Sequence, residues 1–578
     1  MKWQTALCLV LTCSMPLTFS CMNDNGSDDD WDGWGNGGGW GGGGFGSGGG
    51  GIFDDDYDDD YDEGGLFGDS RRVRTRNGGI DGALRDSTRM FLGVPYAAAP
   101  VGDLRWKAPT AYANWGDAEE NIRDAKNYGA RCAQTASSAY NNDASESEDC
   151  LFMNVWTPDK PVSKKLPVMV FIHGGDHLYG GSSDSDGTSE VYDGTKLSEK
   201  GVVVASFNYR LGAFGFFPHP DLQQEDGTYG NQGLLDQVQA LKWIKENISA
   251  FNGDPNNVTI FGQGSGAQDV CFHMVSKESR GLFQQAIGES GGCTDYQPQD
   301  SDVRAGLDKF LKNLKCDGQN ALKCMRSHKA NDVLAAMPKG NENPFKPFVD
   351  GVFLRAQPRD LFDSGDVAKA AYILGTNTNE GTAYSATYGN VTTQAAFEAV
   401  LQQYFPAGAL PDIGKTYSQA QYADTQNPYQ AALSHAFGDG RTVCPTWDTA
   451  TRAYEAGTDV YVYSFAGVPG QTGGALGAAQ SLAEHGAELG HVFGHANSTE
   501  AQQALTDIVQ RYWTNFATYG DPNDNSAYAW PVYSNMKRTP LNLTSSLGLA
   551  EGHDKECALW KSIYTSQFPT TTPIKVTK

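Results

Sequence analysis

The stretch Asn257-Val-Thr-Ile-Phe-Gly-Gln-Gly-Ser-Gly-Ala-Gln268 decides the fold of this chain. Its apolar, β-branched first half predicts a buried strand, and the glycines after it predict a tight turn into a helix. A strand, a sharp turn and a helix in this order form the nucleophile elbow, G-x-S-x-G. The flanking glycines are Gly262 and Gly266, but the residue between them is Gly264 rather than serine.

The neighbouring serine does not restore the motif. Centring the motif on Ser265 would place Gln263 and Ala267 where the small flanking glycines belong. We therefore predict an elbow whose nucleophile position is occupied by Gly264. An elbow holds its apex residue in a strained backbone conformation, and glycine relaxes such strain by about 1–3 kcal/mol. The glycine thus suits a chain that no longer forms an acyl intermediate.

Short apolar runs alternate with helical patterns along the chain. Helical spacing of apolar residues extends from Leu234 to Ile248. This alternation predicts the α/β class, with a mainly parallel central sheet covered by helices on both faces. Side chains that do chemistry are expected at the carboxyl ends of such strands. The expected strands are residues 166–172, 202–208, 258–261, 371–374 and 459–465.

Several further segments resemble, in the same order, those of the type-B carboxylesterases. This α/β-hydrolase family also includes cholinesterases, fungal lipases and the non-catalytic neuroligins. The resemblance runs from about Arg71 to Phe568 and implies an α/β-hydrolase fold for a domain at 71–578. It also implies that Arg105 and Glu148 form a structural salt bridge. The segments that carry it are Phe91-Leu-Gly-Val-Pro-Tyr-Ala97, Leu104-Arg-Trp106, Ser147-Glu-Asp-Cys-Leu-Phe-Met-Asn-Val-Trp156, Asn208-Tyr-Arg-Leu-Gly-Ala-Phe-Gly-Phe216, Gly230-Asn-Gln-Gly-Leu-Leu-Asp236 and Gly253-Asp-Pro255.

The resemblance also implies that two partners of a catalytic triad are retained. Glu380, in Gly375-Thr-Asn-Thr-Asn-Glu-Gly381, matches the triad acid, and His485, in Glu484-His-Gly-Ala-Glu-Leu489, matches the triad histidine. The acid follows the elbow and the histidine comes last, which is the order of these hydrolases. A carboxylate behind an imidazole fixes its tautomer and stabilises the imidazolium. The alternative is a turn histidine and a solvated loop acid.

The oxyanion loop departs from the family pattern. The family reads His-Gly-Gly-Gly followed by an aromatic residue, whereas this chain reads His173-Gly-Gly-Asp-His177. By resemblance the oxyanion hole consists of backbone N–H groups in Gly174, Gly175 and Asp176, joined by that of Ser265. At ~5 Å and an effective dielectric constant of ~20, the Asp176 carboxylate would oppose a developing oxyanion by about 3 kcal/mol. The alternative is that Asp176 turns outward into solvent.

These two departures predict that ester hydrolysis is strongly impaired. We expect the chain to bind a small ester-like or apolar ligand in the retained pocket, or a protein partner on its surface. The alternative is an active carboxylic ester hydrolase that uses Ser265, or a water activated by His485 with help from Asp176 or His177. Ser265 begins a helix, so its side chain is expected to project about 100° around the axis from the apex residue, away from His485.

The N-terminal 70 residues are predicted to lie outside the folded domain. Lys2 and the apolar run after it predict a signal peptide at 1–20, and Cys21 is a candidate for lipid attachment as an alternative to plain cleavage. Residues 22–70 are rich in glycine and aspartate and lack lysine and arginine, which predicts a disordered acidic spacer. Calcium binding by the aspartate runs is the alternative, although they lack the spacing of an EF-hand.

The net charge and the spacing of the histidines argue against nucleic acid and metal ions as ligands. The formal net charge of −25 argues against nucleic acid as a partner. Any membrane association is expected only through the N-terminal lipid. The spacing of His173, His177, His491 and His495 suggests metal ligands, but no third ligand follows at a suitable interval. We interpret them as surface or turn histidines and predict neither a metal nor a cofactor.

The cysteines indicate an oxidising compartment, which agrees with a secreted, cell-surface or cell-envelope protein. By resemblance to the family we expect the pairs Cys132–Cys150, Cys316–Cys324 and Cys444–Cys557. Two further cysteines, Cys271 and Cys293, either pair with each other or leave Cys271 as a small buried apolar residue on the helix after the elbow. We favour the second interpretation.

Overall fold

The computed structural model describes residues 71–116, 119–135, 145–160, 162–185, 190–227, 229–295, 297–338, 343–468, 483–524 and 528–567. These residues belong to one compact unit. The predicted signal peptide, Cys21 and the acidic spacer lie outside the described residues, so these assignments remain predictions.

A central sheet organises the described part of the chain, with eleven strands in the order β16-β15-β14-β13-β12-β11-β9-β10-β8-β4-β3. Neighbours from β10 to β15 pair in parallel, and the strands at both edges pair antiparallel. The sheet is therefore mainly parallel, as predicted. Its strands are β3 (Ala83–Arg85), β4 (Thr88–Pro95), β8 (Phe152–Pro158), β9 (Leu166–Ile172), β10 (Val203–Phe207), β11 (Gly253–Gln263), β12 (Gln285–Glu289), β13 (Ala371–Asn377), β14 (Val460–Gly467), β15 (Leu541–Thr544) and β16 (Gly548–Leu549).

Two smaller sheets stand beside the central one in the described residues. They consist of β1 (Arg72–Thr75), β2 (Gly78–Asp81) and β5 (Arg123–Asp124), and of β6 (Arg131–Cys132) with β7 (Glu146–Ser147). All five predicted strands are present within a few residues of their expected bounds. The sequence did not reveal β12, because it is short and ends on the charged residue Glu289.

The main helices follow the strands. The described α-helices are α1 (Thr195–Ser198), α2 (Gly212–Gly215), α3 (Pro220–Asp226), α4 (Gln232–Asn247), α5 (Ser265–Val275), α6 (Asp300–Asn313), α7 (Ala321–Arg326), α8 (Ala330–Ala336), α9 (Pro358–Asp363), α10 (Thr382–Ala386), α11 (Gln394–Leu401), α12 (Leu410–Thr416), α13 (Pro428–Gly438), α14 (Cys444–Glu455), α15 (Leu489–Val492), α16 (Glu500–Tyr519) and α17 (Asp554–Gln567). None of them is long and apolar enough to span a membrane.

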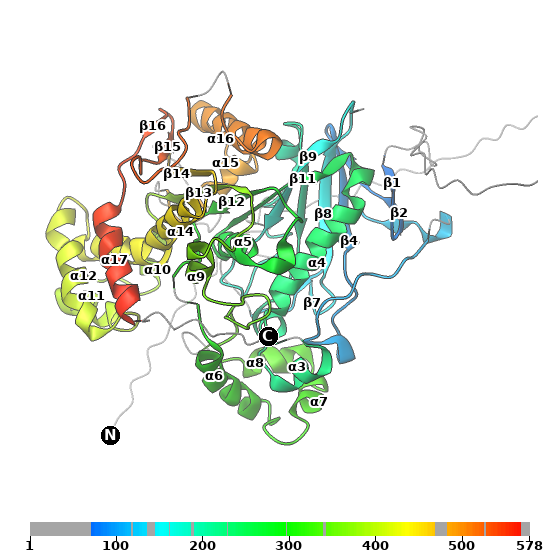
Figure 1. The fold of residues 1–578 in the computed structure, drawn as a ribbon, viewed down its shortest axis with the longest axis horizontal. Coiled ribbons are helices and arrows are strands. Elements are labelled where there is room, and N and C mark those ends of the chain that lie inside the picture. Colours follow the sequence, from blue (N-terminus) through cyan, green and yellow to red (C-terminus); the bar gives the residue numbers. More distant parts are fainter. Residues whose placement is uncertain are drawn as a thin grey trace, which may run out of the picture. The chain divides into compact units, whose positions relative to one another are not determined.

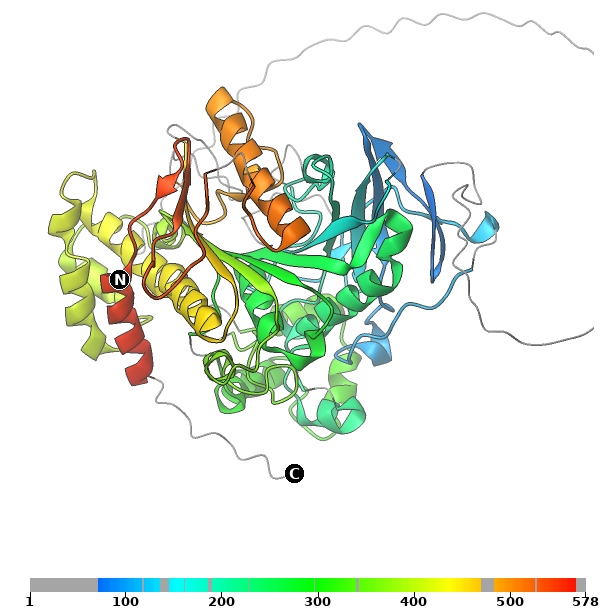
Figure 2. The same ribbon diagram turned by 45° about the horizontal axis from the view of Figure 1, so that its top comes forward.

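Helices cover both faces of the central sheet. In Figures 1 and 2, α16 (orange) lies on one face, whereas α4, α5 (green) and α14 (yellow) lie on the other. Alternation along each strand divides the core accordingly. Val168 and Val170 of β9 join the core beneath α4 and α5, and Met169 and Phe171 join the core beneath α16. Because both faces are buried, the central strands are apolar throughout.

Four disulfides are present in the described residues, including the three expected pairs, Cys132–Cys150, Cys316–Cys324 and Cys444–Cys557. The fourth joins Cys271 to Cys293, so the interpretation of Cys271 as an unpaired apolar residue is wrong. Cys271 is buried in α5, and Cys293 lies just beyond β12, the strand that pairs with β11. Their Cα atoms are 5.8 Å apart, within the range that a disulfide requires.

Candidate active site

The elbow forms where β11 meets α5. β11 ends at Gln263, α5 begins at Ser265, and Gly264 between them has φ 61° and ψ −122°. Both flanking glycines are required by close packing. A Cβ on Gly262 would lie 2.6 Å from backbone atoms of Gly266, and a Cβ on Gly266 would lie 2.1 Å from the carbonyl oxygen of Ile172. The structure therefore supports the register that places Gly264 at the apex.

His485 and Glu380 meet beside this apex. His485 Nδ1 lies 2.6 Å from Glu380 Oε2, and the Glu380 side chain is fully buried. The backbone N–H of Asn377, at the end of β13, donates to the other carboxylate oxygen at 2.6 Å. The backbone N–H of Asn379 donates to the carbonyl of Ala483, which brings the two loops together. Glu380 is thus fixed from two sides and orients the imidazole.

The other ring nitrogen of His485 faces Gly264. A Cβ on Gly264 would lie 2.9 Å from His485 Nε2. This is where a nucleophile at position 264 would meet a general base, which works at hydrogen-bond reach of about 3 Å. Because 2.9 Å is shorter than an ordinary contact to Cβ, a larger residue at position 264 requires His485 to shift slightly.

The side chain of Ser265 does not reach His485. Its Oγ is buried and forms no hydrogen bond with His485 within the described residues. It lies near the hydroxyl of Tyr209, which donates to the carbonyl oxygen of His173 at 2.8 Å. The structure therefore does not bring Ser265 to the base, in agreement with the predicted direction of its side chain.

The loop 173–177 turns beside the elbow. A Cβ on Gly174 would meet the carbonyl oxygen of Gln263 at 2.6 Å, and one on Gly175, where φ is 114°, would meet that of Tyr179 at 2.0 Å. Both positions therefore require glycine. The backbone N–H groups of Gly175, Asp176 and Ser265 donate to no group in the part of the chain that the structure describes. These amides remain available to an anion.

The sequence offered two expectations for Asp176: that its carboxylate opposes charge at the oxyanion loop, or that it turns outward into solvent. Each holds in part. Asp176 is exposed to solvent and adopts a positive φ of 55°. Its charge nevertheless reaches the site. Burial by itself lowers the pKa of His485, but the charge and hydrogen bond of Glu380 outweigh it, with smaller contributions from Glu488 and Asp176, so the net pKa is raised. The carboxylate is solvated but still contributes to the negative field at the imidazole.

The four histidines of the metal hypothesis do not converge. Among the described residues, the candidate ligand cluster is Cys316, Cys324 and His328, whose two sulfurs form a disulfide. The interpretation as surface or turn histidines does not hold for His173 and His491, which are buried outside turns; His177 is buried but lies in a turn, and His495 is half-buried.

His173 and His177 are each held by specific side-chain contacts. His173 stacks on Tyr209 at 4.4 Å between ring centroids, and burial lowers its pKa to about 4. His177 Nε2 lies 2.8 Å from Oδ1 of Asp269 in α5, and the Nε2 amide of Gln237 in α4 donates to the other carboxylate oxygen at 2.7 Å. The histidine after Asp176 therefore ties the loop 173–177 to the elbow helix.

Sequence reasoning missed two buried carboxyl groups behind the triad positions. Glu488 accepts a hydrogen bond from the side-chain amide of Asn377, and Glu289 accepts one from Trp513 Nε1 at 2.7 Å. Burial, together with the charge of Glu380, raises the pKa of Glu488 to about 7, and burial and Glu488 raise that of Glu289 well above its ordinary value. Their positions gave a signal, because Glu289 ends a central strand and Glu488 follows His485 by three residues.

Comparison with known proteins agrees with this geometry. The model of the carboxylesterase family matches residues 69–560. The chain belongs to the carboxylesterase family. Like other members of this family, it therefore has an α/β-hydrolase fold and is related to ester hydrolases.

Curated carboxylesterase-family relatives cover most of the chain. A cholinesterase of Mus musculus is 32% identical over 85% of this chain and 86% of its own length. A fumonisin B1 esterase of Sphingopyxis macrogoltabida is 31% identical over 84% of this chain and 88% of its own length. A para-nitrobenzyl esterase of Bacillus subtilis (strain 168) is 32% identical over 84% of this chain and 97% of its own length.

The salt bridge expected from the family resemblance is also formed in this carboxylesterase-family chain. Arg105 Nε and Nη2 donate to the two carboxylate oxygens of Glu148 at 2.6 and 2.5 Å. Arg105 Nη1 donates to the carbonyl oxygens of Met325 and His328. The pair joins the segment before β8 to α7 and the residues after it, which makes it a fold element.

Proposed function

We propose that this carboxylesterase-family protein hydrolyses esters only weakly and binds a small ester-like or apolar ligand at the elbow. The observation that carries the proposal is the approach of His485 Nε2 to Gly264, which has no side chain to offer it a proton. The base and its acid are in place, but they face a residue that cannot attack a carbonyl.

The expected loss of rate is large. Removing the nucleophile of a serine protease costs about 2 × 10⁶ in kcat, and the oxyanion hole and substrate binding leave a residual 10³–10⁴ over water. The free amides of Gly175, Asp176 and Ser265 support such a residual interaction with a carbonyl oxygen. The exposed carboxylate of Asp176 weakens it. Binding without efficient acyl transfer is the function that this arrangement favours.

A second candidate is hydrolysis by a water that His485 activates directly. The contact between His485 and the open side of Gly264 favours it over attack by Ser265, whose buried Oγ has no bond to the base. This route needs no acyl-enzyme. It therefore differs from serine catalysis in its response to covalent probes.

The test combines a serine-reactive fluorophosphonate with assays of short p-nitrophenyl esters on the purified protein. We expect no labelling of Ser265 and hydrolysis close to the rate of buffer alone. Labelling of Ser265 with turnover above background would contradict the proposal. Turnover without labelling that disappears in His485→Ala would establish the water route instead. Saturation-transfer NMR with an unactivated ester, such as ethyl butyrate, reports binding of the intact ligand.

We further propose that the protein is exported and acts outside the reducing cytosol. The disulfides of the described residues support this, since such bonds persist in oxidising compartments. Mass spectrometry of the mature N-terminus tests it. A chain that begins after residue 20, with or without lipid on Cys21, is expected, and an intact Met1 in the mature protein would refute export by cleavage.

A further inference from the structure

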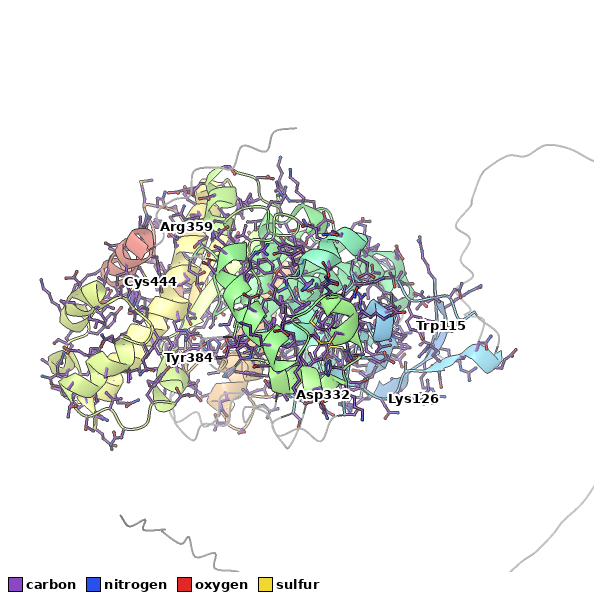
Figure 3. The ribbon with its side chains drawn as sticks, turned by 90° about the horizontal axis from the view of Figure 1, so that it is seen from below. Trp115, Lys126, Asp332, Arg359, Tyr384 and Cys444 are labelled. Carbon is purple, nitrogen blue, oxygen red and sulfur yellow. A yellow bond between two sulfur atoms is a disulfide. The ribbon has the colours of Figure 1, made fainter. Side chains whose placement is uncertain are left out.

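A pocket lies among α14, α17, α9 and the segment after β12. Its volume is about 190 Å³, and none of its lining residues belongs to the candidate active site. Figure 3 shows Arg359 of α9 and Cys444 of α14 on the same side of the molecule, beside α17. The pocket is smaller than the roughly 300–1,000 Å³ of pockets for drug-sized ligands, so it suits a small molecule.

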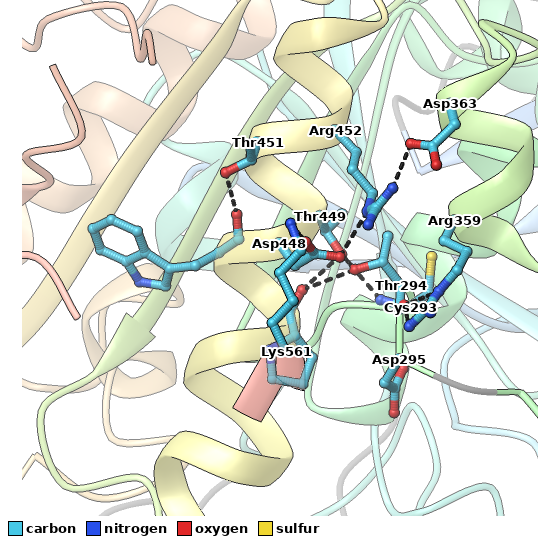
Figure 4. Close-up of polar contacts among 12 residues, drawn as sticks. Cys293, Thr294, Asp295, Arg359, Asp363, Asp448, Thr449, Thr451, Arg452 and Lys561 are labelled. Atoms are coloured by element: carbon cyan, nitrogen blue, oxygen red, sulfur yellow. Dashed lines mark hydrogen bonds and ion pairs between the residues drawn. The ribbon is translucent and has the colours of Figure 1, made fainter. Parts of the chain in front are cut away.

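Most charged groups in the wall neutralise one another. Arg452 Nε donates to Asp448 at 2.7 Å, and its Nη1 donates to Asp363 (Figure 4). Arg538 lies 3.5 Å from Asp554. Lys561 Nζ lies 3.9 Å from Asp448 and is largely exposed. These pairs define the rim and leave little charge for a ligand.

Arg359 and Asp295 are the exceptions. Arg359 uses Nε and Nη2 on the carbonyl oxygen of Thr294, at 3.1 and 2.9 Å, so three of its five N–H groups remain. Asp295 accepts hydrogen bonds from Gln297 Nε2, at 2.9 Å, and from its own backbone N–H. Within the described residues neither forms an ion pair, although the two charges are close enough to influence each other. Figure 4 shows Arg359 reaching toward the Thr294–Asp295 segment.

The rest of the wall is aromatic. Trp447 of α14 lines the pocket together with Trp560 and Tyr564 of α17. The rings of Trp560 and Tyr564 stack at 6.1 Å between centroids. An apolar surface thus adjoins one guanidinium and one carboxyl group that form no ion pair with any other described residue.

We propose that this pocket binds a small zwitterion, such as a free amino acid with an apolar side chain. Arg359 binds its carboxylate, Asp295 binds its ammonium group, and the rings of Trp447 and Tyr564 contact its side chain, with the fully buried Trp560 packed behind Tyr564. Guanidinium and carboxylate form strong paired hydrogen bonds, and Asp295 supplies the opposite charge that an ammonium group needs. A ligand with only one of the two charges would satisfy one wall residue and leave the other without a partner.

The protonation of Asp295 makes this binding dependent on pH. Burial raises the pKa of Asp295 to about 7, against the charge of Arg359 from α9. Arg441, before α14, also lowers this pKa, and Asp448 of α14 raises it. Burial, together with the charge of the same carboxyl group, also raises the pKa of Tyr564 of α17. Because an ammonium group needs the ionised carboxylate, affinity is expected to rise between pH 6 and 8 around this pKa of about 7.

Isothermal titration calorimetry of the full chain with three probes of similar shape tests the proposal. The probes are phenylalanine, 3-phenylpropionate, which lacks the ammonium group, and phenethylamine, which lacks the carboxylate. We expect phenylalanine to bind at least tenfold more tightly than either analogue. Absence of saturable binding, or an analogue that binds as tightly as phenylalanine, would overturn the proposal.

Variants locate the binding site. Arg359→Met and Asp295→Asn are each expected to weaken phenylalanine binding at least tenfold, and Asp295→Asn also to remove the dependence on pH. Arg280→Met is the matched control, because Arg280 pairs with Asp366 outside the pocket, and it should leave affinity within twofold. Circular dichroism confirms that each variant is folded. Equal affinity in the Arg359 and Asp295 variants would show that phenylalanine binds elsewhere.

Discussion

His485 is held by Glu380 through Nδ1 at 2.6 Å, and its Nε2 is directed at Gly264, 2.9 Å from where a Cβ would be. A histidine held by a buried carboxylate thus faces a residue without a side chain, and the proposed function rests on this arrangement. The relationship between His485 and Gly264 can be tested directly by restoring a serine at position 264 and a glycine at position 176.

The double variant Gly264→Ser with Asp176→Gly is expected to gain activity on p-nitrophenyl esters, by at least about 10³-fold in kcat/KM, because the nucleophile and a neutral oxyanion loop return together. Gly264→Ser alone should gain less, since repulsion from Asp176 remains, but by at most about two decades because that carboxylate is exposed to solvent. Steady-state kinetics with fluorophosphonate titration measure both. Gly264→Ala with Asp176→Gly is the control and should stay inactive. A folded but inactive double variant would remove the support for Glu380 and His485 as triad partners.

His485 is expected to titrate above its ordinary pKa of 6.5, since Glu380 outweighs the effect of burial. A raised pKa stabilises the fold fully below the unfolded value near 6.5, and this stabilisation is lost as pH rises through the folded pKa. NMR titration of the imidazole checks the direction. In Glu380→Gln the titration should shift to lower pH, and the stability difference from the parent should be larger at pH 5.5 than at pH 8.5. A midpoint unchanged by the substitution would contradict the assigned pair.

Gly266→Ala is expected to destabilise the fold by about 3 kcal/mol, because backbone would have to move to admit the new atom. Its Cβ would lie 2.1 Å from the carbonyl oxygen of Ile172. Gly318→Ala is the matched control, since a Cβ there meets nothing within 4 Å. Urea denaturation of both variants measures the difference. Equal stability would show that the elbow packs less closely than described.

Removing His177 is expected to destabilise the fold by about 1–3 kcal/mol, because the buried Asp269 would lose one hydrogen-bond partner and keep Gln237. Asp269 is fully buried and 2.8 Å from His177 Nε2. A double-mutant cycle with His177→Ala, Asp269→Ala and the pair, followed by urea denaturation, measures their coupling. We expect the double variant to lose less than the sum of the single variants. Additive losses would mean that the two side chains act independently.

Much of the fold was predictable from local pattern. The apolar runs of β9, β10, β11, β13 and β14 are long or β-rich enough to predict buried strands, and the helical spacing at 234–248 predicted α4. The short strand β12 was not predictable, because its pairing with β11 and β13 defines it more than its own composition does. The partner of Cys271 was also beyond local pattern, since the disulfide depends on the adjacency of β11 and β12.

The sequence by itself determined that an elbow exists and that Gly264 occupies its apex, because glycine spacing and order along the chain carry that information. It also determined which acid and which histidine to examine. Only the tertiary structure decided that His485 Nε2 approaches Gly264, that Ser265 does not reach the base, and that His177 is buried against Asp269. These relationships join residues up to 221 positions apart, and distance in the chain says nothing about such contacts until the strands and helices have packed.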